Sequence, residues 1–326
     1  MTNPIEVSDL KKSFHVGGKE IRAVQGISLT VRDQEIFGFL GPNGAGKSTT
    51  LRMLTTLLPI DGGSARVCGF DLKTQQNNVR QSIGYVSQSG GADLPATGRE
   101  NLILAARLYG MRRSAASARA DELLSLFDLT ALSDRIVRTY SGGQRRRLEV
   151  ALAMVNKPSV LFLDEPTTGL DLQNRANLWD QIRLLREHGT TVFLTTHYLE
   201  EADALCDRLC IIDDGRIVAE GTPPDLKRSI SGDVVRLTLN DGNQADLSFF
   251  RALPHVKDLR SEGDVITLYT DAGPALMQAL FPLLEKIHRT AESISLTQAS
   301  LDDVFLKKTG RCLRDAETEV PCETHD

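Results

Sequence analysis

The segment EIFGFLGPNGAGKST, residues 35–49, constrains the fold of this 326-residue chain more than any other stretch. Ile36–Leu40 is an apolar run that favours a buried strand, and it leads directly into a glycine-rich turn. A helix is predicted to begin at about Lys47. Glycines at such a turn let backbone N–H groups close around an anion at the start of a helix. The segment therefore predicts a phosphate-binding loop within an α/β domain.

The loop fits the pattern G-x-x-x-x-G-K-[ST], in which a lysine contacts the terminal phosphates and a hydroxyl holds Mg²⁺. We expect Lys47 to bridge the β- and γ-phosphates, Ser48 to bind Mg²⁺ and Thr49 to contact the α-phosphate. The alternative is a glycine-rich turn without a ligand, which the flanking strand and helix disfavour. The residues predicted to bind nucleotide here are Gly41, Pro42, Asn43, Gly44, Ala45, Gly46, Lys47, Ser48 and Thr49.

A second apolar stretch, VLFLDEP, ends in two carboxylates at residues 164 and 165. Asp164 lies at the end of a predicted buried strand, where it can orient Mg²⁺ through water. Glu165 follows at the edge of the site and can polarise an attacking water. The alternative is a solvated acidic turn. The pair becomes specific for phosphate chemistry only together with Lys47.

Composition excludes several classes of protein. The net charge of −5 gives no reason to expect nucleic-acid binding, which needs a basic face. No window reaches 18 uninterrupted apolar residues, so no membrane-spanning helix is expected. The N-terminal sequence MTNPIEVSDLKKSF has early charges and lacks the apolar core of a signal peptide.

Five cysteines allow two interpretations. Cys206 and Cys210 could face each other one helical turn apart and recruit a metal. No second Cys/His pair stands at ligand spacing, so reduced structural thiols in a cytosolic protein are the favoured interpretation. The remaining cysteines are Cys68, Cys312 and Cys322.

The pattern along the chain predicts an α/β domain followed by a smaller α+β domain. Strands and helices alternate through residues 1–225, which favours a mainly parallel sheet with a small β element at the start. Helical periodicity over about 98–140 indicates a helical insertion. Residues 226–310 show the order β-α-β-β-α-β, which suggests a ferredoxin-like fold. Residues 311–326 are polar and are expected to form a flexible tail.

The segment TYSGGQRRRLEV, residues 139–150, contains a second glycine pair ahead of a predicted helix. The helix is expected from Gln144 onward. Two glycines at a helix entrance again suit an anion. Arg145, Arg146 and Arg147 are interpreted as a solvated helix face rather than as phosphate ligands. A chain that already has one phosphate loop needs a reason for the second.

The order and spacing of these motifs resemble those in the ATP-binding subunits of ABC transporters. The matching elements are GPNGAGKST, GYVSQ, YSGGQ, LDEPTTGLD and TTH, and together with their flanks they cover about residues 5–223. GTPases carry an N-K-x-D element, and here NKPS has Ser159 in place of the aspartate. Kinases need a site for the substrate that accepts the phosphate, and no motif in the sequence indicates one.

The resemblance implies a head-to-tail dimer in which each ATP lies between the phosphate loop of one copy and the signature of the other. It implies Gln88 as a ligand of Mg²⁺ and of the attacking water. His197 would contact the γ-phosphate, Asp171 would cross the dimer, and Phe14 would stack on adenine. The implied signature residues are Ser141, Gly142, Gly143 and Gln144. The implied catalytic residues are Lys47, Gln88, Glu165 and His197, and the implied metal ligands are Ser48, Gln88 and Asp164.

Two residues depart from the usual family pattern, Tyr140 in place of leucine and Leu172 in place of proline. Neither change removes a catalytic group. The expected cofactors are ATP and Mg²⁺. The expected partners are a second copy and a separate membrane permease, and the expected location is the cytoplasmic face of a bacterial membrane.

Finer matches, such as TYSGGQRRRLEVA and LDDVFLKKTG, resemble the daunorubicin/doxorubicin-resistance type of ATP-binding subunit, which implies drug export. The C-terminal domain is then expected to serve dimer contact or regulation. Export of lipid, polysaccharide or a nodulation-type glycolipid remains an alternative. A soluble ABC ATPase acting on DNA or ribosomes is a second alternative, although the sequence shows no coiled coil, zinc module or second ATPase unit. A non-hydrolysing subunit is disfavoured because Glu165 and His197 are both present.

Overall fold

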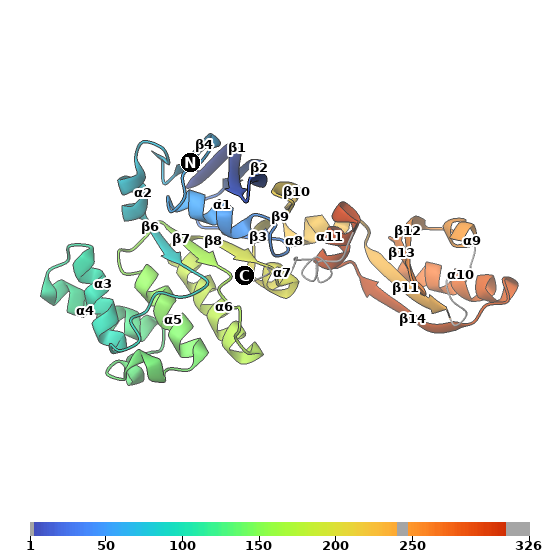
Figure 1. Ribbon diagram of the computed structural model, residues 1–326. Helices are drawn as coiled ribbons and strands as arrows, with labels where there is room; N and C mark the ends of the chain where they lie inside the picture. Colours follow the sequence, from blue (N-terminus) through green and yellow to red (C-terminus); the bar gives the residue numbers. More distant parts are fainter. Residues whose placement is uncertain (1–2, 240–246, 311–326) are drawn as a thin grey trace. The chain divides into compact units, whose positions relative to one another are not determined.

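The computed structural model describes residues 3–239 and 247–310 of the chain (Figure 1). It divides into two compact units, with the division after Glu220. Each unit encloses a hydrophobic cluster of its own. The predicted tail, residues 311–326, lies outside the described residues, and so do Cys312 and Cys322.

The first unit begins with a four-stranded antiparallel sheet in the order β2-β1-β4-β5. The first two strands stay paired with each other out to the Val16–Lys19 turn. Their outer residues are exposed and, apart from Val16 and Ile21, mostly polar, so no apolar alternation marks them. The strands of this sheet are β1 (Ile5–Val16), β2 (Lys19–Val31), β4 (Gly62–Val67) and β5 (Phe70–Asp71).

A six-stranded sheet in the order β10-β9-β3-β8-β7-β6 forms the centre of the first unit. Its pairs β6–β7, β7–β8, β8–β3 and β3–β9 are parallel, which confirms the predicted fold class. Its strands are β3 (Ile36–Leu40), β6 (Ile83–Val86), β7 (Val160–Asp164), β8 (Thr191–Thr196), β9 (Arg208–Asp213) and β10 (Arg216–Gly221).

Strand register places the predicted catalytic segments at one edge of this sheet. Leu40 pairs with Thr196 across β3 and β8, and Asp164 pairs with Thr195 across β7 and β8. The carboxyl ends of neighbouring parallel strands therefore meet, which is where α/β sheets bind ligands. Behind this edge, Phe193 packs against three other phenylalanine rings with centroid separations of 5.6 to 5.7 Å. These rings belong to Phe37, Phe39 and Phe162, and all are fully buried.

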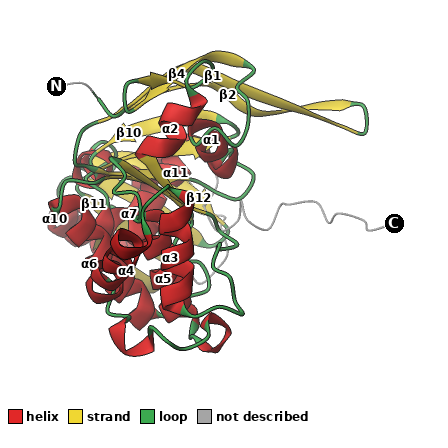
Figure 2. Ribbon diagram, turned by 90° about the vertical axis from the view of Figure 1, so that its left-hand side faces the viewer, coloured by secondary structure: helices red, strands yellow, loops and turns green. Residues whose placement is uncertain are grey.

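Seven α-helices are described in the first unit, and their termini set the position of the site residues. Helices α3 and α4 form the predicted helical insertion, which lies at the end of the unit away from the antiparallel sheet in Figures 1 and 2. Short helix α2 was not predicted. The helices are α1 (Lys47–Leu54), α2 (Gln76–Ser82), α3 (Gly98–Leu108), α4 (Arg113–Leu126), α5 (Gly142–Ala153), α6 (Leu172–Glu187) and α7 (Leu199–Leu205).

The second unit has the predicted β-α-β-β-α-β succession. Its antiparallel sheet has the order β12-β13-β11-β14, which is the ferredoxin-like arrangement. Two further helices, α8 and α11, were not predicted. The elements are α8 (Pro223–Arg228), β11 (Asp233–Leu239), α9 (Leu247–Arg251), β12 (Val256–Glu262), β13 (Val265–Thr270), α10 (Gly273–Lys286), β14 (Ala291–Gln298) and α11 (Leu301–Thr309).

The cysteine geometry considered from the sequence is wrong. Cys206 follows the last residue of α7, whereas Cys210 lies inside strand β9, so the two do not share a helix. Burial raises the pKa of both thiols and raises the pKa of Cys68 to about 11. Among the described residues, no group of three or more His, Cys, Asp or Glu side chains is arranged to hold a metal. The described thiols are therefore neutral core side chains.

Within residues 3–239 and 247–310, no helix combines the length and the apolar character that crossing a bilayer requires.

Candidate functional site

The phosphate loop connects β3 to α1 in a conformation that only glycine satisfies at Gly46. This residue has φ 101°, and a Cβ atom there would lie 2.4 Å from the carbonyl oxygen of Ala23. Gly46 is also the N-cap of α1, so the helix begins at Lys47 as predicted. The Lys47 side chain folds back over the loop and donates hydrogen bonds to the Gly41 and Pro42 carbonyl oxygens, at 2.8 and 3.0 Å. Lys47 is thus buried against the start of the loop, whereas Asn43 and Gly44 at the loop's tip are exposed.

The Asp164 carboxylate lies against the first turn of α1. Ser48 Oγ donates to Asp164 Oδ1 at 3.0 Å, and Thr195 Oγ1 donates to the same oxygen at 2.7 Å. Only 1% of Asp164 is exposed. A buried carboxylate joined to a hydroxyl is an oxygen-only donor set of the kind that Mg²⁺ prefers. Ser48 and Asp164 therefore fit the predicted metal site.

Three predicted catalytic residues converge on Glu165. Lys47 Nζ lies 3.2 Å from its Oε1, and His197 Nδ1 lies 3.2 Å from its Oε2. Gln88 Nε2 donates to Oε2 at 3.1 Å. The side chain is 7% exposed, so it is buried within the site and does not lie at the edge where it was expected.

The environment of Glu165 keeps its carboxyl ionised. Burial by itself would raise its pKa, but contact with His197 and the positive charge of Lys47 outweigh burial and lower the pKa to about 2. An ionised carboxylate can accept a proton from water, which is the property that a general base needs. The backbone of Glu165 has φ 46°, in the left-handed region that non-glycine residues rarely adopt.

The signature segment forms the start of α5. This helix begins at Gly142, two residues before the predicted start, because Ser141 is its N-cap. Ser141 Oγ accepts from Gln144 N at 3.2 Å, and Gln144 Oε1 accepts from Ser141 N at 2.9 Å. Ser141 is exposed. The helix N-terminus and its serine are therefore available to a ligand that approaches from outside.

Asp171, the aspartate expected to cross the dimer, is connected to this segment. Asp171 is the N-cap of α6 and accepts from the backbone and the side chain of Asn174, both at 2.8 Å. Asn174 in turn packs against Gly143, where a Cβ atom would lie 2.1 Å from Asn174 Oδ1. The chain thus holds two groups of site residues, one around Glu165 and one around Gly143.

Phe14 belongs to neither group. It lies in β1, half-buried, with Lys12 Nζ 5.6 Å from its ring centroid. The predicted role in adenine stacking stays a prediction.

The interpretation of the three arginines is wrong for Arg146. Arg145 is exposed, as expected of a solvated helix face, but Arg146 is only 7% exposed and donates hydrogen bonds to the end of β7. Arg147 is partly buried and donates to the Phe127 carbonyl oxygen. A charged run in sequence does not reveal which member turns inward, so only the tertiary structure identifies Arg146.

Sequence reasoning also missed two hydrogen-bonding residues around the site. The Thr195 hydroxyl contacts Asp164 and also accepts from the Glu165 backbone N–H at 3.0 Å. Glu201 of α7 is fully buried and accepts from Trp179 Nε1 at 3.1 Å. The TTH motif contained the signal for Thr195. Nothing in the sequence distinguished buried Glu201 from exposed Glu200.

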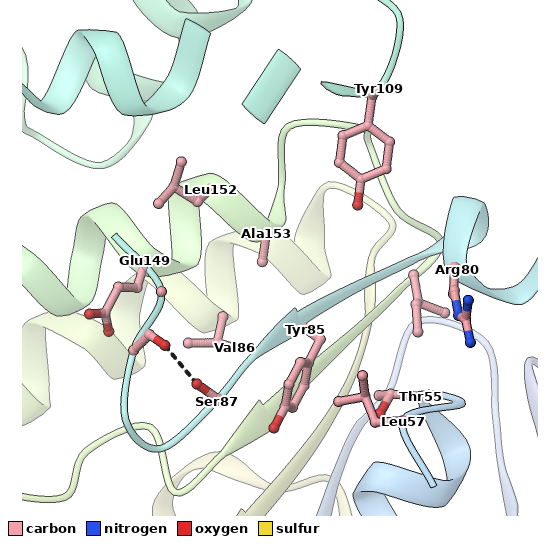
Figure 3. A pocket seen from close by; sticks show the side chains of 13 residues that line it. Thr55, Leu57, Arg80, Tyr85, Val86, Ser87, Tyr109, Glu149, Leu152 and Ala153 are labelled. Carbon is pink, nitrogen blue, oxygen red and sulfur yellow. Dashed lines mark hydrogen bonds between the residues drawn. The ribbon is translucent and has the colours of Figure 1, made fainter. Parts of the chain in front are cut away.

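A cavity of about 470 Å³ opens beside the Gln88 segment (Figure 3). One wall is formed by α5 and another by β6 and the residues that follow it. Leu57 and Tyr109 at its rim are 55% and 48% exposed. The lining residues are Thr55, Leu57, Arg80, Ile83, Tyr85, Val86, Ser87, Gly90, Gly91, Tyr109, Glu149, Leu152 and Ala153.

Comparison with protein families identifies both parts of the chain. Residues 24–168 match the family described as ABC transporter. Residues 221–309 match the family described as ATP-binding protein DrrA1-3-like, C-terminal domain. The two matches fall on the two structural units.

Individual proteins resemble the chain over nearly its whole length. The daunorubicin/doxorubicin resistance ATP-binding protein DrrA of Streptomyces peucetius is 43% identical, over 99% of this chain and 97% of the relative. The Nod factor export ATP-binding protein I of Burkholderia lata is 40% identical, over 96% of this chain and 99% of the relative. Among solved structures, a dimeric post-hydrolysis state of the ATP-binding cassette MJ0796 bound to ADP and Pi has a TM-score of 0.61 and 25% identity. It covers 67% of this chain and 98% of its own.

Proposed function

The chain belongs to the ATP-binding subunits of ABC transporters, in the group that includes DrrA, and we propose that it powers export of a drug-like molecule through a separate membrane permease. It is an ATPase subunit. The observation that carries the proposal is the match over nearly the whole chain to a daunorubicin/doxorubicin resistance protein, C-terminal unit included.

In the proposed cycle, two copies close head to tail on ATP. The Ser141 hydroxyl and the free N–H groups at the start of α5 bind the γ-phosphate of the ATP held by the partner's phosphate loop. Free N–H groups and the helix dipole favour an anion at this position. Because the γ-phosphate makes these contacts only in the closed dimer, ATP stabilises closure and its hydrolysis releases it.

Hydrolysis itself is assigned to the group around Glu165. Ionised Glu165 takes a proton from the attacking water, which Gln88 helps to orient. Lys47 and His197 stabilise negative charge on the transferring phosphoryl group. Ser48 and Asp164 would hold Mg²⁺, which would supply charge neutralisation on the phosphate oxygens. The 3.2 Å contacts of Glu165 with Lys47 and His197 support this assignment.

We place the permease at the cavity beside Gln88. Leu57 and Tyr109 present exposed apolar surface at its rim, and its wall includes Ser87, the residue before Gln88. A cytoplasmic segment of the permease bound there would contact the segment that carries Gln88, whose side chain donates a hydrogen bond to Glu165. Transport and hydrolysis would then be linked through a single loop.

The test is co-purification from membranes, with the captured polytopic protein identified by mass spectrometry. We expect Leu57→Asp together with Tyr109→Asp to abolish capture, whereas Val16→Asp, at an apolar site on the β1–β2 hairpin that is at least as exposed, leaves it intact. Capture of only ribosomal or chromosomal proteins would favour the soluble ABC ATPase instead. Retention of the permease by the double variant would place docking elsewhere.

A second candidate cargo is a nodulation-type glycolipid, which the 40% identity to a Nod factor export protein favours. Efflux of a fluorescent anthracycline from intact cells separates the two. Loss of efflux in the Glu165→Gln variant supports drug export. Unchanged drug efflux with altered extracellular glycolipid supports the second candidate.

A further inference from the structure

The guanidinium group of Arg146 has an acceptor for each of its five N–H groups. Nε donates to Pro166 O at 2.7 Å, and Nη1 donates to Ser87 O at 2.8 Å and to Glu149 Oε2 at 3.0 Å. Nη2 donates to Asp164 O at 3.1 Å and to Glu165 O at 3.4 Å. Four of these acceptors are main-chain carbonyls. A buried guanidinium whose donors are all used fixes the relative positions of the segments it bridges.

Three consecutive carbonyls at the end of β7 face this one group. The middle one belongs to Glu165, whose φ of 46° is an unfavourable conformation for a residue with a side chain. Such a conformation persists where surrounding contacts over-determine it. The bonds from Arg146 to the carbonyls on both sides of Glu165 supply contacts of this kind. On the opposite side, the Glu165 N–H is held by Thr195.

The same guanidinium also holds the segment that carries Gln88. Ser87, whose carbonyl it binds, is the residue before Gln88, and Gln88 Nε2 donates to Glu165. Glu149, one turn along α5, pairs with Arg146 and approaches Gly90, where a Cβ atom would lie 2.1 Å from Glu149 Oε1. Arg146 therefore contacts Glu165 by two routes. It binds the Glu165 backbone directly, and it holds the segment of Gln88, which donates to the Glu165 carboxylate.

We infer that Arg146 is a positioning residue that orients the Glu165 carboxylate. Through Arg146, this orientation depends on the positions of the signature helix and of the Gln88 segment. Arg146 lies four residues after Gly142, the first residue of α5, on the helix that meets the partner's ATP in the proposed dimer. A shift of α5 would therefore change the position of Glu165, because the fully hydrogen-bonded guanidinium group of Arg146 joins the two. The inference rests on the proposed role of Glu165 as general base.

Arg146→Lys tests the inference, because lysine keeps the charge but has three donors in place of a five-donor planar fork. We expect kcat for ATP hydrolysis to fall roughly 10- to 100-fold, the range that misplacing a catalytic group produces. The nucleotide affinity, the melting temperature and ATP-dependent dimer formation should stay near those of the wild type. The ATP-bound dimer should persist on size-exclusion chromatography, as in a variant that binds ATP without hydrolysing it.

Arg147→Lys is the matched control. Arg147 is the next residue on the same helix and also donates to carbonyls, but those of Phe127 and Asp128. We expect its kcat to stay near the wild-type value. Equal losses in the two variants, wild-type turnover in Arg146→Lys, or loss of its turnover together with dimer formation and stability would each overturn the inference.

Glu165→Gln, measured alongside, separates this inference from the proposal on which it rests. If that variant hydrolyses ATP normally, Glu165 is not the base, and both fail. If Glu165→Gln is inactive and Arg146→Lys is not, only the inference about Arg146 fails.

Discussion

Gly143 of the signature segment and Asn174 of α6 are in such close contact that a Cβ atom on Gly143 would lie 2.1 Å from Asn174 Oδ1. Asn174 also donates to the Asp171 carboxylate from its side-chain nitrogen at 2.8 Å. The absence of a side chain at Gly143 therefore leaves room for the Asn174 side chain that holds Asp171. Any side chain at Gly143 must displace Asn174 and disturb that bond.

We predict that Gly143→Ala lowers kcat by about 10-fold, on the scale of other misplaced site residues. Adding Asn174→Ala should recover the part of the loss that comes from the clash, because alanine makes room for the new methyl group, but not the part that comes from the missing bond to Asp171. The test is a double-mutant cycle on ATPase rates. Strictly additive effects in the cycle would show that the contact does not transmit the perturbation.

Replacing Glu165 with glutamine should separate ATP binding from hydrolysis. The amide keeps the size of the side chain but cannot accept a proton from water, so kcat should fall by about 100-fold or more. ATP should still bind, because Lys47 and the loop carbonyls remain. Steady-state turnover and size-exclusion chromatography with ATP are the measurements. Turnover near the wild-type rate would remove Glu165 from the mechanism.

Mixing two defective chains tests the shared site. A Lys47→Ala chain and a Ser141→Arg chain are each expected to be inactive alone. In a mixed dimer, one site combines both defects, while the other combines an intact phosphate loop with an intact signature. Partial recovery of ATPase activity on mixing is the expected result. Two folded chains that never recover activity would argue against a head-to-tail dimer.

The Ser48–Asp164 pair should determine the metal requirement. Its 3.0 Å hydrogen bond places a hydroxyl and a carboxylate oxygen together at the end of β7. Asp164→Asn removes the charge, so we expect a higher Mg²⁺ concentration for half-maximal ATPase activity and a lower maximum. Titration of activity with Mg²⁺ after chelation measures both. An unchanged titration curve would assign the metal to other ligands.

The low pKa of Glu165 predicts a pH window for its contribution to stability. A carboxyl whose pKa is lower in the folded state stabilises the protein above its ordinary value of 4.5, and loses that contribution as pH falls toward about 2. The difference in unfolding free energy between wild type and Glu165→Gln should therefore be constant near neutral pH and shrink below about pH 4.5. Denaturant titrations across this range measure it. If the difference in unfolding free energy grew on acidification, the pKa of Glu165 would be raised in the folded state, contrary to this prediction.

Much of the fold follows from local sequence patterns. Ile36–Leu40 and the start of α1 at Lys47 match the prediction, since an apolar run and a glycine turn encode them without help from distant residues. Short helices α2, α8 and α11 were not predicted. In α11, Asp303 pairs with Arg236 of β11 at 2.6 Å, a contact between residues far apart in the chain.

The motifs and their order could be predicted from the sequence, because each motif is a short stretch whose residue types suit one chemistry. The contacts through which the motifs act together depend on the tertiary structure. Strand register brings Asp164 beside Ser48. The Arg146 side chain is buried, although that of its neighbour Arg145 is exposed. Such choices depend on which groups meet across the packed elements, and no local pattern records that.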